Sequence, residues 1–257
     1  MNSSSAPFTV LITGASSGIG YELALGYLQQ GARVFVLGRA AHKLAQLEEQ
    51  FPARCLPVSV DLSDTQDSQR AGEFINRNTQ HLDLAILNAG TCEYVDVANL
   101  SLEPFEKVMA INWQGTINSL LFCLPLLRHG NEQNKRAQLV GIPSMASILP
   151  MPRSQAYGAS KVAVEYLLNS LRVDLVNEAI DITIVRPGFV KTPLTQRNDF
   201  SMPFLQTTTV AANKIMSGIK KRKWLVQFPL PLVLLMNSIA VLPLRLQVWL
   251  LQKISRA

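Results

Sequence analysis

The feature of this sequence that most constrains its fold is a glycine-rich turn between an apolar run and a helical stretch near the N-terminus. The turn spans residues 13–20, reads TGASSGIG and directly follows the apolar run Phe8–Ile12. Gly14 lets the chain leave a strand sharply, Gly18 lets the backbone approach a pyrophosphate, and Gly20 lets the next helix pack closely. The helix N-terminus then offers free N–H groups to phosphate. This context predicts a dinucleotide-binding unit rather than an ordinary tight turn.

The rest of the chain alternates short apolar runs with longer amphipathic stretches. The runs are dense, as is typical of strands covered on both faces: Phe8–Ile12, Arg33–Leu37, Cys55–Val60, Leu82–Leu87, Gln138–Ile142 and Asp181–Val185. The helical patterns are Gly18–Gln30, Ala40–Gln50, Ser63–Thr79 (with Ser63 as the cap), Pro104–Arg128 and Gln155–Asn177. We therefore expect an α/β fold, a doubly wound (Rossmann) parallel sheet with helices on both faces, in one domain over residues 1–219.

The ends of the second and third expected strands bear on the choice of cofactor. The second strand ends in Gly38 and Arg39, where an NAD-preferring site usually carries an acidic residue. The glycine leaves room for a 2′-phosphate and the guanidinium can bind it, which favours NADP(H) over NAD(H). A solvated arginine is the alternative. Asp61 is placed to accept a hydrogen bond from the adenine amino group, or to cap the helix that opens at Ser63.

The fourth expected strand ends in Asn88, Ala89 and Gly90. Small residues here permit close contact with the adenine ribose. The Asn88 amide can equally tie neighbouring strands together, so a ligand role and a structural role both stay open.

A tyrosine and a lysine four residues apart form the centre of the predicted chemistry. Tyr157 and Lys161 share one face of an expected helix, where the ammonium would lower the phenol pKa from its reference value of about 10. Such a phenol can exchange protons near neutral pH, and Lys161 can also hydrogen-bond a nicotinamide ribose. Ser144 could hold a substrate oxygen, with Ser147 as the rival. Asn112 could hold a water that links Lys161 to solvent.

These motifs, in this order, resemble those of the short-chain dehydrogenase/reductase family over about residues 8–195. The resemblance implies a sheet of about seven strands, the last near Trp224–Phe228, and hydride transfer to or from a nicotinamide. It maps a catalytic tetrad onto Asn112, Ser144, Tyr157 and Lys161. It also implies cofactor contacts from Gly14, Ser16, Ser17, Gly18, Ile19, Gly20, Arg39, Asp61, Leu62, Asn88, Ala89, Gly90, Tyr157, Lys161, Pro187, Gly188, Val190 and Thr192. Ser147 stands where the family usually has glycine.

The segment after Thr192 corresponds to the family's mobile lid over the substrate. Its apolar side chains, and those expected across the cleft, suggest a small hydrophobic carbonyl or alcohol substrate, although they could simply pack on one another. They are Leu194, Phe200, Met202, Phe204 and Leu205, facing Ile148, Leu149 and Met151. We expect an oxidoreductase working as a reductase in the cell. The alternative is a non-catalytic NADP(H)-binding scaffold. The family also implies a homodimer or homotetramer through Pro104–Arg128 and Gln155–Asn177.

The positive charge is concentrated at the C-terminal end. The chain has 24 basic and 18 acidic residues, and seven of the basic residues but no acidic one lie in residues 220–257. Charge confined to this apolar extension argues against nucleic acid as a partner. It favours contact with a membrane surface, or packing over the cleft or a second subunit. The uncharged run Trp224–Leu244 is interrupted by prolines, which argues against a bilayer span.

Two further patterns bear on cell compartment and metal binding. Cys55, Cys92 and Cys123 are odd in number and widely spaced, so we expect neither a disulfide framework nor a metal site. The N-terminal residues lack the basic and apolar pattern of a secretory signal. We expect a cytoplasmic protein that could lie against the inner face of a membrane.

Overall fold

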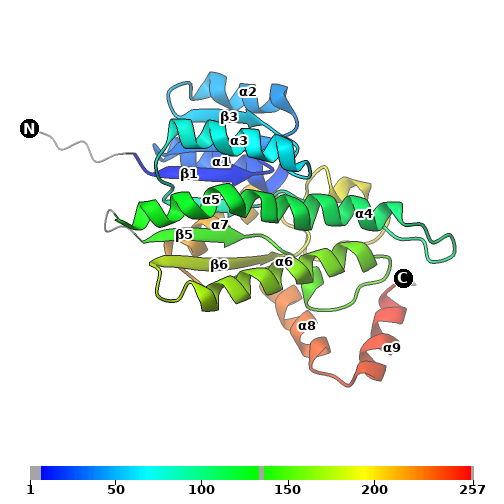
Figure 1. The fold of residues 1–257 in the computed structure, drawn as a ribbon. Helices are drawn as coiled ribbons and strands as arrows, with labels where there is room; N and C mark the ends of the chain where they lie inside the picture. Colours follow the sequence, from blue (N-terminus) through cyan, green and yellow to red (C-terminus); the bar gives the residue numbers. More distant parts are fainter. Residues whose placement is uncertain (1–6, 133–135, 256–257) are drawn as a thin grey trace, which may run out of the picture.

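A seven-stranded parallel sheet runs through the computed structural model, which describes residues 7–132 and 136–255. The strands are β1 (Thr9–Thr13), β2 (Arg33–Gly38), β3 (Cys55–Ser59), β4 (Leu84–Leu87), β5 (Ala137–Gly141), β6 (Ile180–Pro187) and β7 (Leu225–Phe228). Their order is β3-β2-β1-β4-β5-β6-β7 (Figure 1). The order reverses between β1 and β4, and ligands bind at such a switch point, beyond the carboxyl ends of the strands. The predicted fold class is confirmed.

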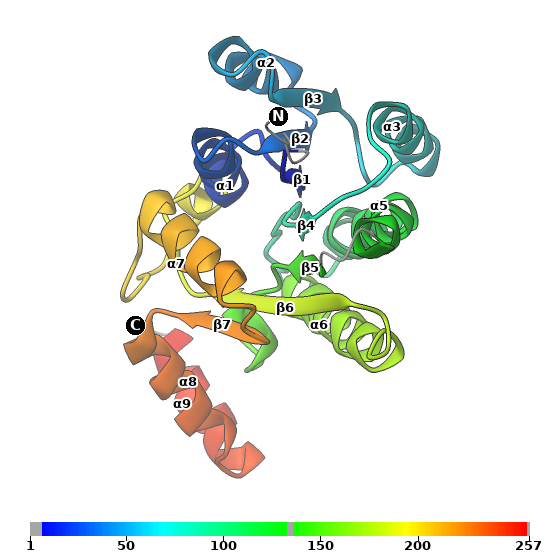
Figure 2. The ribbon, with the colours of Figure 1, turned by 90° about the vertical axis from the view of Figure 1, so that its left-hand side faces the viewer.

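Helices cover both faces of the sheet (Figure 2). One face carries α1 (Gly18–Gln29), α2 (Ala41–Gln50) and α7 (Thr208–Lys220), and the other carries α3 (Thr65–Asn78), α5 (Gly115–Glu132) and α6 (Gln155–Asp174). The apolar runs serve both layers, because Val10 and Ile12 belong to one hydrophobic core and Leu11 to the other. Two-sided burial is the physical reason for the dense apolar pattern of the strands.

The long helix predicted over Pro104–Arg128 contains a local irregularity. The chain forms α4 (Glu103–Met109), one π-helical turn η1 (Ala110–Gln114), and then α5. Asn112 lies in this π-helical turn and is almost fully buried. Single π-helical turns within longer helices are frequent at functional sites, because they redirect side chains.

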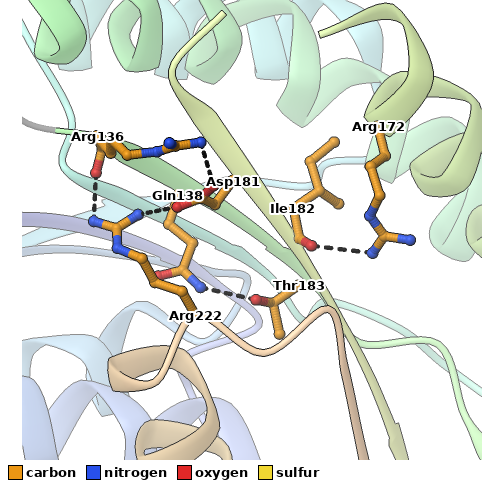
Figure 3. Close-up of polar contacts among 7 residues, drawn as sticks. All are labelled: Arg136, Gln138, Arg172, Asp181, Ile182, Thr183 and Arg222. Carbon is orange, nitrogen blue, oxygen red and sulfur yellow. Dashed lines mark hydrogen bonds and ion pairs between the residues drawn. The ribbon is translucent and has the colours of Figure 1, made fainter. Parts of the chain in front are cut away.

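Polar contacts tie the segment that enters β7 to the two preceding strands (Figure 3). The Thr183 hydroxyl donates to the Lys223 carbonyl at 2.7 Å, and Arg222 donates to the Arg136 carbonyl, also at 2.7 Å. Arg222 and Arg136 both form ion pairs with Asp181. The seventh strand, expected near Trp224–Phe228, thus belongs to the main sheet, and Arg222 shares the Asp181 carboxylate with Arg136.

The chain ends in two helices that leave the sheet. Helix α8 (Leu230–Ala240) and helix α9 (Leu244–Ser255) form a V whose turn points away from the body (Figure 1). The inner side of α8 is buried in a small apolar cluster that includes Leu232 and Met236. None of the helices among the described residues combines the length and the apolar character needed to cross a membrane.

Candidate functional site

A groove of about 380 Å³ lies at the switch point, at the carboxyl ends of the strands. Its volume is within the range of small-molecule sites. It brings together all but one of the predicted cofactor residues: Gly14, Ser16, Ser17, Gly18, Ile19, Arg39, Asp61, Leu62, Asn88, Ala89, Gly90, Tyr157, Lys161, Pro187, Gly188, Val190 and Thr192. Ser144 also lines it, whereas Gly20 and Asn112 do not.

The glycine turn has the backbone that its sequence requires. Gly14 and Gly18 have φ values of +67° and +61°, a region that favours glycine. A Cβ on Gly20 would lie 2.3 Å from the Gly14 carbonyl oxygen, so this glycine permits the helix to pack, as predicted. Ser17 caps α1 without a side-chain hydrogen bond, and the first turn holds no acidic residue. The α1 N–H groups therefore remain able to bind an anion, which fits a dinucleotide phosphate.

Asn88 connects the ends of β4 and β1. Its amide nitrogen Nδ2 donates to the Thr13 and Gly14 carbonyls at 3.0 and 3.3 Å. The Thr13 hydroxyl oxygen accepts hydrogen bonds from the Asn88 and Ala89 backbone N–H groups at 2.9 and 3.0 Å. Asn88 also lines the groove, so the structural role and a ligand contact are compatible.

Asp61 organises the turn between β3 and α3 but does not cap the helix. Its Oδ1 accepts from the Ser63 N–H at 3.0 Å and from the Ser63 hydroxyl at 2.6 Å. Although burial opposes ionisation, these bonds and the nearby Arg39 lower the pKa of Asp61 below its ordinary value. Helix α3 begins at Thr65, and its cap is Asp64, which accepts from a backbone N–H. Both cap predictions, Ser63 and Asp61, are wrong, because these two residues bond each other.

Arg39 lies at the groove's edge with an exposed side chain. Within the described part of the chain, its guanidinium makes neither a hydrogen bond nor an ion pair. Gly38 faces Ser16, whose Oγ would lie 3.1 Å from an added Cβ, so a larger residue would crowd this part of the groove. The pair therefore provides an exposed cation at the edge of the groove and no side chain at Gly38 to narrow it.

Ser144, Tyr157 and Lys161 meet in the wall of the groove. Ser144 lies close enough to the Tyr157 phenol to lower its pKa slightly, and the Ser144 Oγ accepts from the Ala146 N–H at 3.1 Å. The Lys161 ammonium donates to the Ile142 carbonyl at 3.2 Å and lies 5.6 Å from the centre of the Tyr157 ring. The three side chains that sequence spacing singled out are thus neighbours in space.

The pKa values of this pair differ from the expectation. Burial raises the pKa of Tyr157 to about 12, and the nearby Ser144 side chain only partly opposes this effect. Burial also lowers the pKa of Lys161 to about 8. The expected lowering of the phenol pKa by the ammonium is wrong for this arrangement, because burial of the phenol outweighs the influences that lower its pKa. The phenol is therefore protonated at neutral pH, as a proton donor must be.

Asn112 bonds Thr91, in the segment after β4, and Ser160 of α6, and does not line the groove. Its Oδ1 accepts from the Thr91 N–H at 2.7 Å, and its Nδ2 donates to the Thr91 carbonyl and the Ser160 hydroxyl, both at 2.9 Å. An added Cβ on Gly90 would lie 3.1 Å from the Lys161 Nζ and 3.2 Å from the Asn112 Oδ1. Asn112 thus approaches Lys161 across Gly90, and its role in holding a water stays a prediction.

Ser147, the rival to Ser144, points to a different set of partners. Its hydroxyl lies 2.6 Å from Glu165 Oε2 and 2.7 Å from the Ser144 carbonyl oxygen. Glu165 is buried on α6 and also pairs with Arg186 of β6, whose Nε donates to Oε2 at 2.8 Å. Sequence reasoning missed this ion pair, which joins the Ser144 loop, α6 and β6.

Polar contacts fasten the predicted lid to the loop after β4 and to the loop before α6. The Tyr94 hydroxyl donates to Asn198 Oδ1 at 2.6 Å, and Arg153 pairs with Asp199 at 2.9 Å. Phe200 makes an edge contact with the Tyr94 ring, with the centroids 5.9 Å apart. The lid is therefore held at one end of the groove.

The apolar residues predicted on the two sides of the cleft are not all together. Leu194 lines the groove, whereas Ile148, Leu149 and Met151 pack with the inner side of α8. Sequence reasoning missed other groove residues, namely Ala40, Val60, Ser63, Ile111, Ile142, Pro143, Pro193 and Thr195. Most of these lie within two positions of a predicted site residue, so proximity in sequence was the available signal.

The lowered pKa of Lys161 predicts a pH-dependent stability. The ordinary lysine pKa is 10.5, against about 8 in the folded protein. Between these values the unfolded chain holds more protons, so stability rises with pH from about 8 to 10.5. Lys161→Met should remove the cost of burying the ammonium, on the order of 3 kcal/mol at pH 7, and this advantage should disappear by about pH 10.5.

Thermal unfolding of the ligand-free protein from pH 7 to 10.5 measures this effect. Lys43→Met, at an exposed position on α2, is the matched control. A stability difference for Lys161→Met that stays constant with pH would contradict the burial of its charge.

Comparisons with known proteins agree with the groove's architecture. A family model described as short chain dehydrogenase matches residues 8–201. An uncharacterized oxidoreductase of Myxococcus xanthus is 34% identical over 238 residues, covering 91% of this chain and 92% of that protein. A Pseudomonas aeruginosa 3-oxoacyl-(acyl-carrier-protein) reductase of rhamnolipids biosynthesis is 33% identical over 69% of this chain and 71% of its own length. The solved Pseudomonas aeruginosa RhlG/NADP active-site complex has a TM-score of 0.69 and 32% identity, covering 75% of this chain and 77% of that one.

Proposed function

This chain belongs to the short-chain dehydrogenase/reductase family of oxidoreductases, and on that premise we propose that it transfers hydride between NADP(H) and a hydrophobic carbonyl or alcohol, as a reductase in the cell. The observation that carries the proposal is the meeting of Ser144, Tyr157 and Lys161 in the groove that begins at the glycine turn. A screen of carbonyl compounds with NADPH, followed at the nicotinamide absorbance, tests it. No oxidation of NADPH with any compound would favour the scaffold alternative.

The chemistry assigns one task to each side chain. The nicotinamide, when bound, supplies the hydride to the carbonyl carbon. The Tyr157 phenol, protonated because its pKa is about 12, donates the proton to the carbonyl oxygen. Ser144, which lines the groove beside that phenol, holds the same oxygen, and Lys161 holds the nicotinamide ribose. Asn112 would connect Lys161 to solvent through a water.

The preference for NADP(H) rests on Gly38 and Arg39. The Arg39 guanidinium is exposed at the edge of the groove and suited to a 2′-phosphate. Arg39→Ala should weaken NADPH binding about 10- to 100-fold, as expected for a hydrogen bond to a charged group, and leave NADH binding almost unchanged.

Titration of each cofactor, followed by nicotinamide fluorescence, gives the two dissociation constants. Arg77→Ala is the matched control, since Arg77 is also exposed but lies on α3 outside the groove. Equal losses for NADPH and NADH in Arg39→Ala would sink the assignment of Arg39 to the 2′-phosphate.

The substrate class is supported by the apolar wall beside the predicted catalytic groups. Pro143, Pro193 and Leu194 line the groove together with Ser144 and Tyr157. The reductase of rhamnolipids biosynthesis, one of the similar proteins, is named for a 3-oxoacyl substrate, which is a carbonyl on an acyl chain. A series of carbonyl substrates of increasing chain length should therefore show kcat/KM rising with length.

We also propose a homodimer or homotetramer assembled through α5 and α6. These helices expose large apolar side chains, including Leu121, Val162 and Tyr166. Apolar patches of this kind mark interaction sites. Light scattering coupled to size-exclusion chromatography gives the mass in solution.

A further inference from the structure

The V formed by α8 and α9 has an apolar outer surface with positive charge and no acidic side chain. We propose that this outer surface binds the face of an anionic lipid bilayer. The proposal goes beyond the oxidoreductase activity and does not depend on it.

The outer surface is apolar because the two helices bury only part of their circumference. On α8, Leu232, Val233, Met236 and Ile239 are buried towards the body. The exposed large apolar side chains of the V are Leu230, Leu234 and Leu235 of α8, Val241 of the turn, and Leu244, Leu246, Val248 and Trp249 of α9. Isolated exposed apolar residues need no explanation, but so many within two short consecutive helices favour an interaction site.

The turn of the V carries the most exposed of these residues. Val241 is 83% exposed and Leu244 is 68% exposed. Both flank the turn between α8 and α9, and this turn is the part of the V that extends farthest from the sheet (Figure 1). Because α8 and α9 have only 11 and 12 residues, a shallow position among headgroups and upper acyl chains suits them better than a span.

The charges of α9 suit an anionic surface. Arg245 and Lys253 are exposed, and the Lys253 ammonium lies 3.9 Å from the centre of the Trp249 ring. Tryptophan is enriched at membrane interfaces, and long basic side chains can reach from an apolar position to headgroups. Arg256 would add to this charge but lies outside the described residues.

The same charges argue against a second copy as the occupant. A two-fold interface places the same surface on both sides, so Arg245 and Lys253 would face an equally basic partner. Residues 220–257 contain no acidic residue that could pair with them. Like charges opposed across an interface disfavour association, whereas anionic headgroups supply the missing negative charge.

The basic cluster before β7, residues 220–223, contributes less to lipid binding in this proposal. Arg222 is already paired with Asp181 within the sheet (Figure 3). Lys220, Lys221 and Lys223 are exposed but lie before β7, at the opposite end of that strand from α8. The test therefore concentrates on α8, α9 and the turn between them.

Co-sedimentation of the full chain with lipid vesicles tests the proposal. The vesicles are phosphatidylcholine alone, or phosphatidylcholine mixed with phosphatidylglycerol. We expect binding to the mixed vesicles, weaker binding to the neutral ones, and weakening of the binding by salt.

Replacing both Val241 and Leu244 with aspartate should lower the partition by about a hundredfold or more, since two apolar side chains would no longer enter the interface. Replacing both Arg245 and Lys253 with glutamine should lower it about thirtyfold on mixed vesicles at low salt.

Val176→Asp is the matched control, because Val176 is 73% exposed but lies just after α6, outside the V. This control should bind vesicles like the wild type, and far-ultraviolet circular dichroism verifies that each variant is folded. A blue shift of tryptophan emission on mixed vesicles that Trp249→Phe removes would support the assignment to α9.

Three outcomes would overturn the proposal. Wild-type protein that stays in the supernatant with mixed vesicles does so directly. Equal losses in Val176→Asp and in the double aspartate variant would remove the assignment to the V. A fall in solution mass in the double aspartate variant, without vesicle binding by the wild type, would assign the surface to a second copy. None of these outcomes bears on turnover of a water-soluble carbonyl compound, so the proposed oxidoreductase activity is tested separately.

Discussion

Tyr157→Phe is expected to lower kcat by about a thousandfold, because the variant keeps the ring but has no proton to donate to the substrate oxygen. The phenol is the group in the groove whose pKa of about 12 keeps it protonated at neutral pH and which lies beside Ser144. NADPH binding should stay near the wild-type value, because the ring remains in place. Stopped-flow or steady-state assays give kcat, and a fluorescence titration gives the dissociation constant.

The matched control is Tyr166→Phe on the same helix. Tyr166 is 77% exposed and lies outside the groove, so loss of its hydroxyl should leave both quantities unchanged. Wild-type turnover in Tyr157→Phe would refute the assignment of Tyr157 as the proton donor. Loss of NADPH binding in parallel with turnover would instead show that the phenol holds the cofactor.

Glu165→Ala is expected to lower the free energy of unfolding by about 3 kcal/mol, because it leaves the partly buried Arg186 guanidinium without its carboxylate. The two side chains are only 11% and 22% exposed. Glu165 also lies 2.6 Å from the Ser147 hydroxyl, so its loss should loosen the loop that carries Ser144 and reduce kcat as well. Urea unfolding of the ligand-free protein measures the change.

Two variants separate a buried ion pair from a general surface effect. The double variant Glu165→Ala/Arg186→Leu should be more stable than Glu165→Ala alone, because no unpaired charge is left in the interior. Glu73→Ala, which breaks an exposed pair with Arg77, should change stability by less than about 1 kcal/mol. Equal effects of Glu165→Ala and Glu73→Ala would show that the Glu165–Arg186 pair contributes no more than a surface contact.

The parts of the site that could be predicted from the sequence are those fixed by local spacing. Gly14 and Gly18 adopt the positive φ that their places in the turn require. Tyr157 and Lys161 lie four residues apart on α6 and share its groove-facing side. In each case the backbone within a few residues determines where the side chain points, so a single sequence contains the needed information.

Other features could not be predicted, because they depend on competition between neighbouring side chains or on contacts with residues far away in the sequence. Asp61, Ser63 and Asp64 all have side chains that can accept from a helix N-terminus. Asp61 and Ser63 hydrogen-bond each other, and Asp64 accepts from the Asp67 N–H as the cap. The π-helical turn at Asn112 has no characteristic residue, so the apolar periodicity of the sequence does not reveal it. The pKa values in the groove follow from desolvation by elements far apart in the chain, which spacing along one helix does not report.

Helix α8 packs directly against the end of β6, which forms part of the groove wall. A Cβ added to Gly188, at the end of β6, would lie 2.6 Å from the Leu232 side chain of α8, so the groove wall and α8 share a packed boundary. Binding equilibria at two sites that share a movable element are linked, and the linkage is reciprocal. If lipid binding shifts α8 and thereby changes the affinity for NADPH by some factor, then NADPH binding must change the affinity for lipid by the same factor. Vesicle partition measured with and without NADPH would give that factor directly.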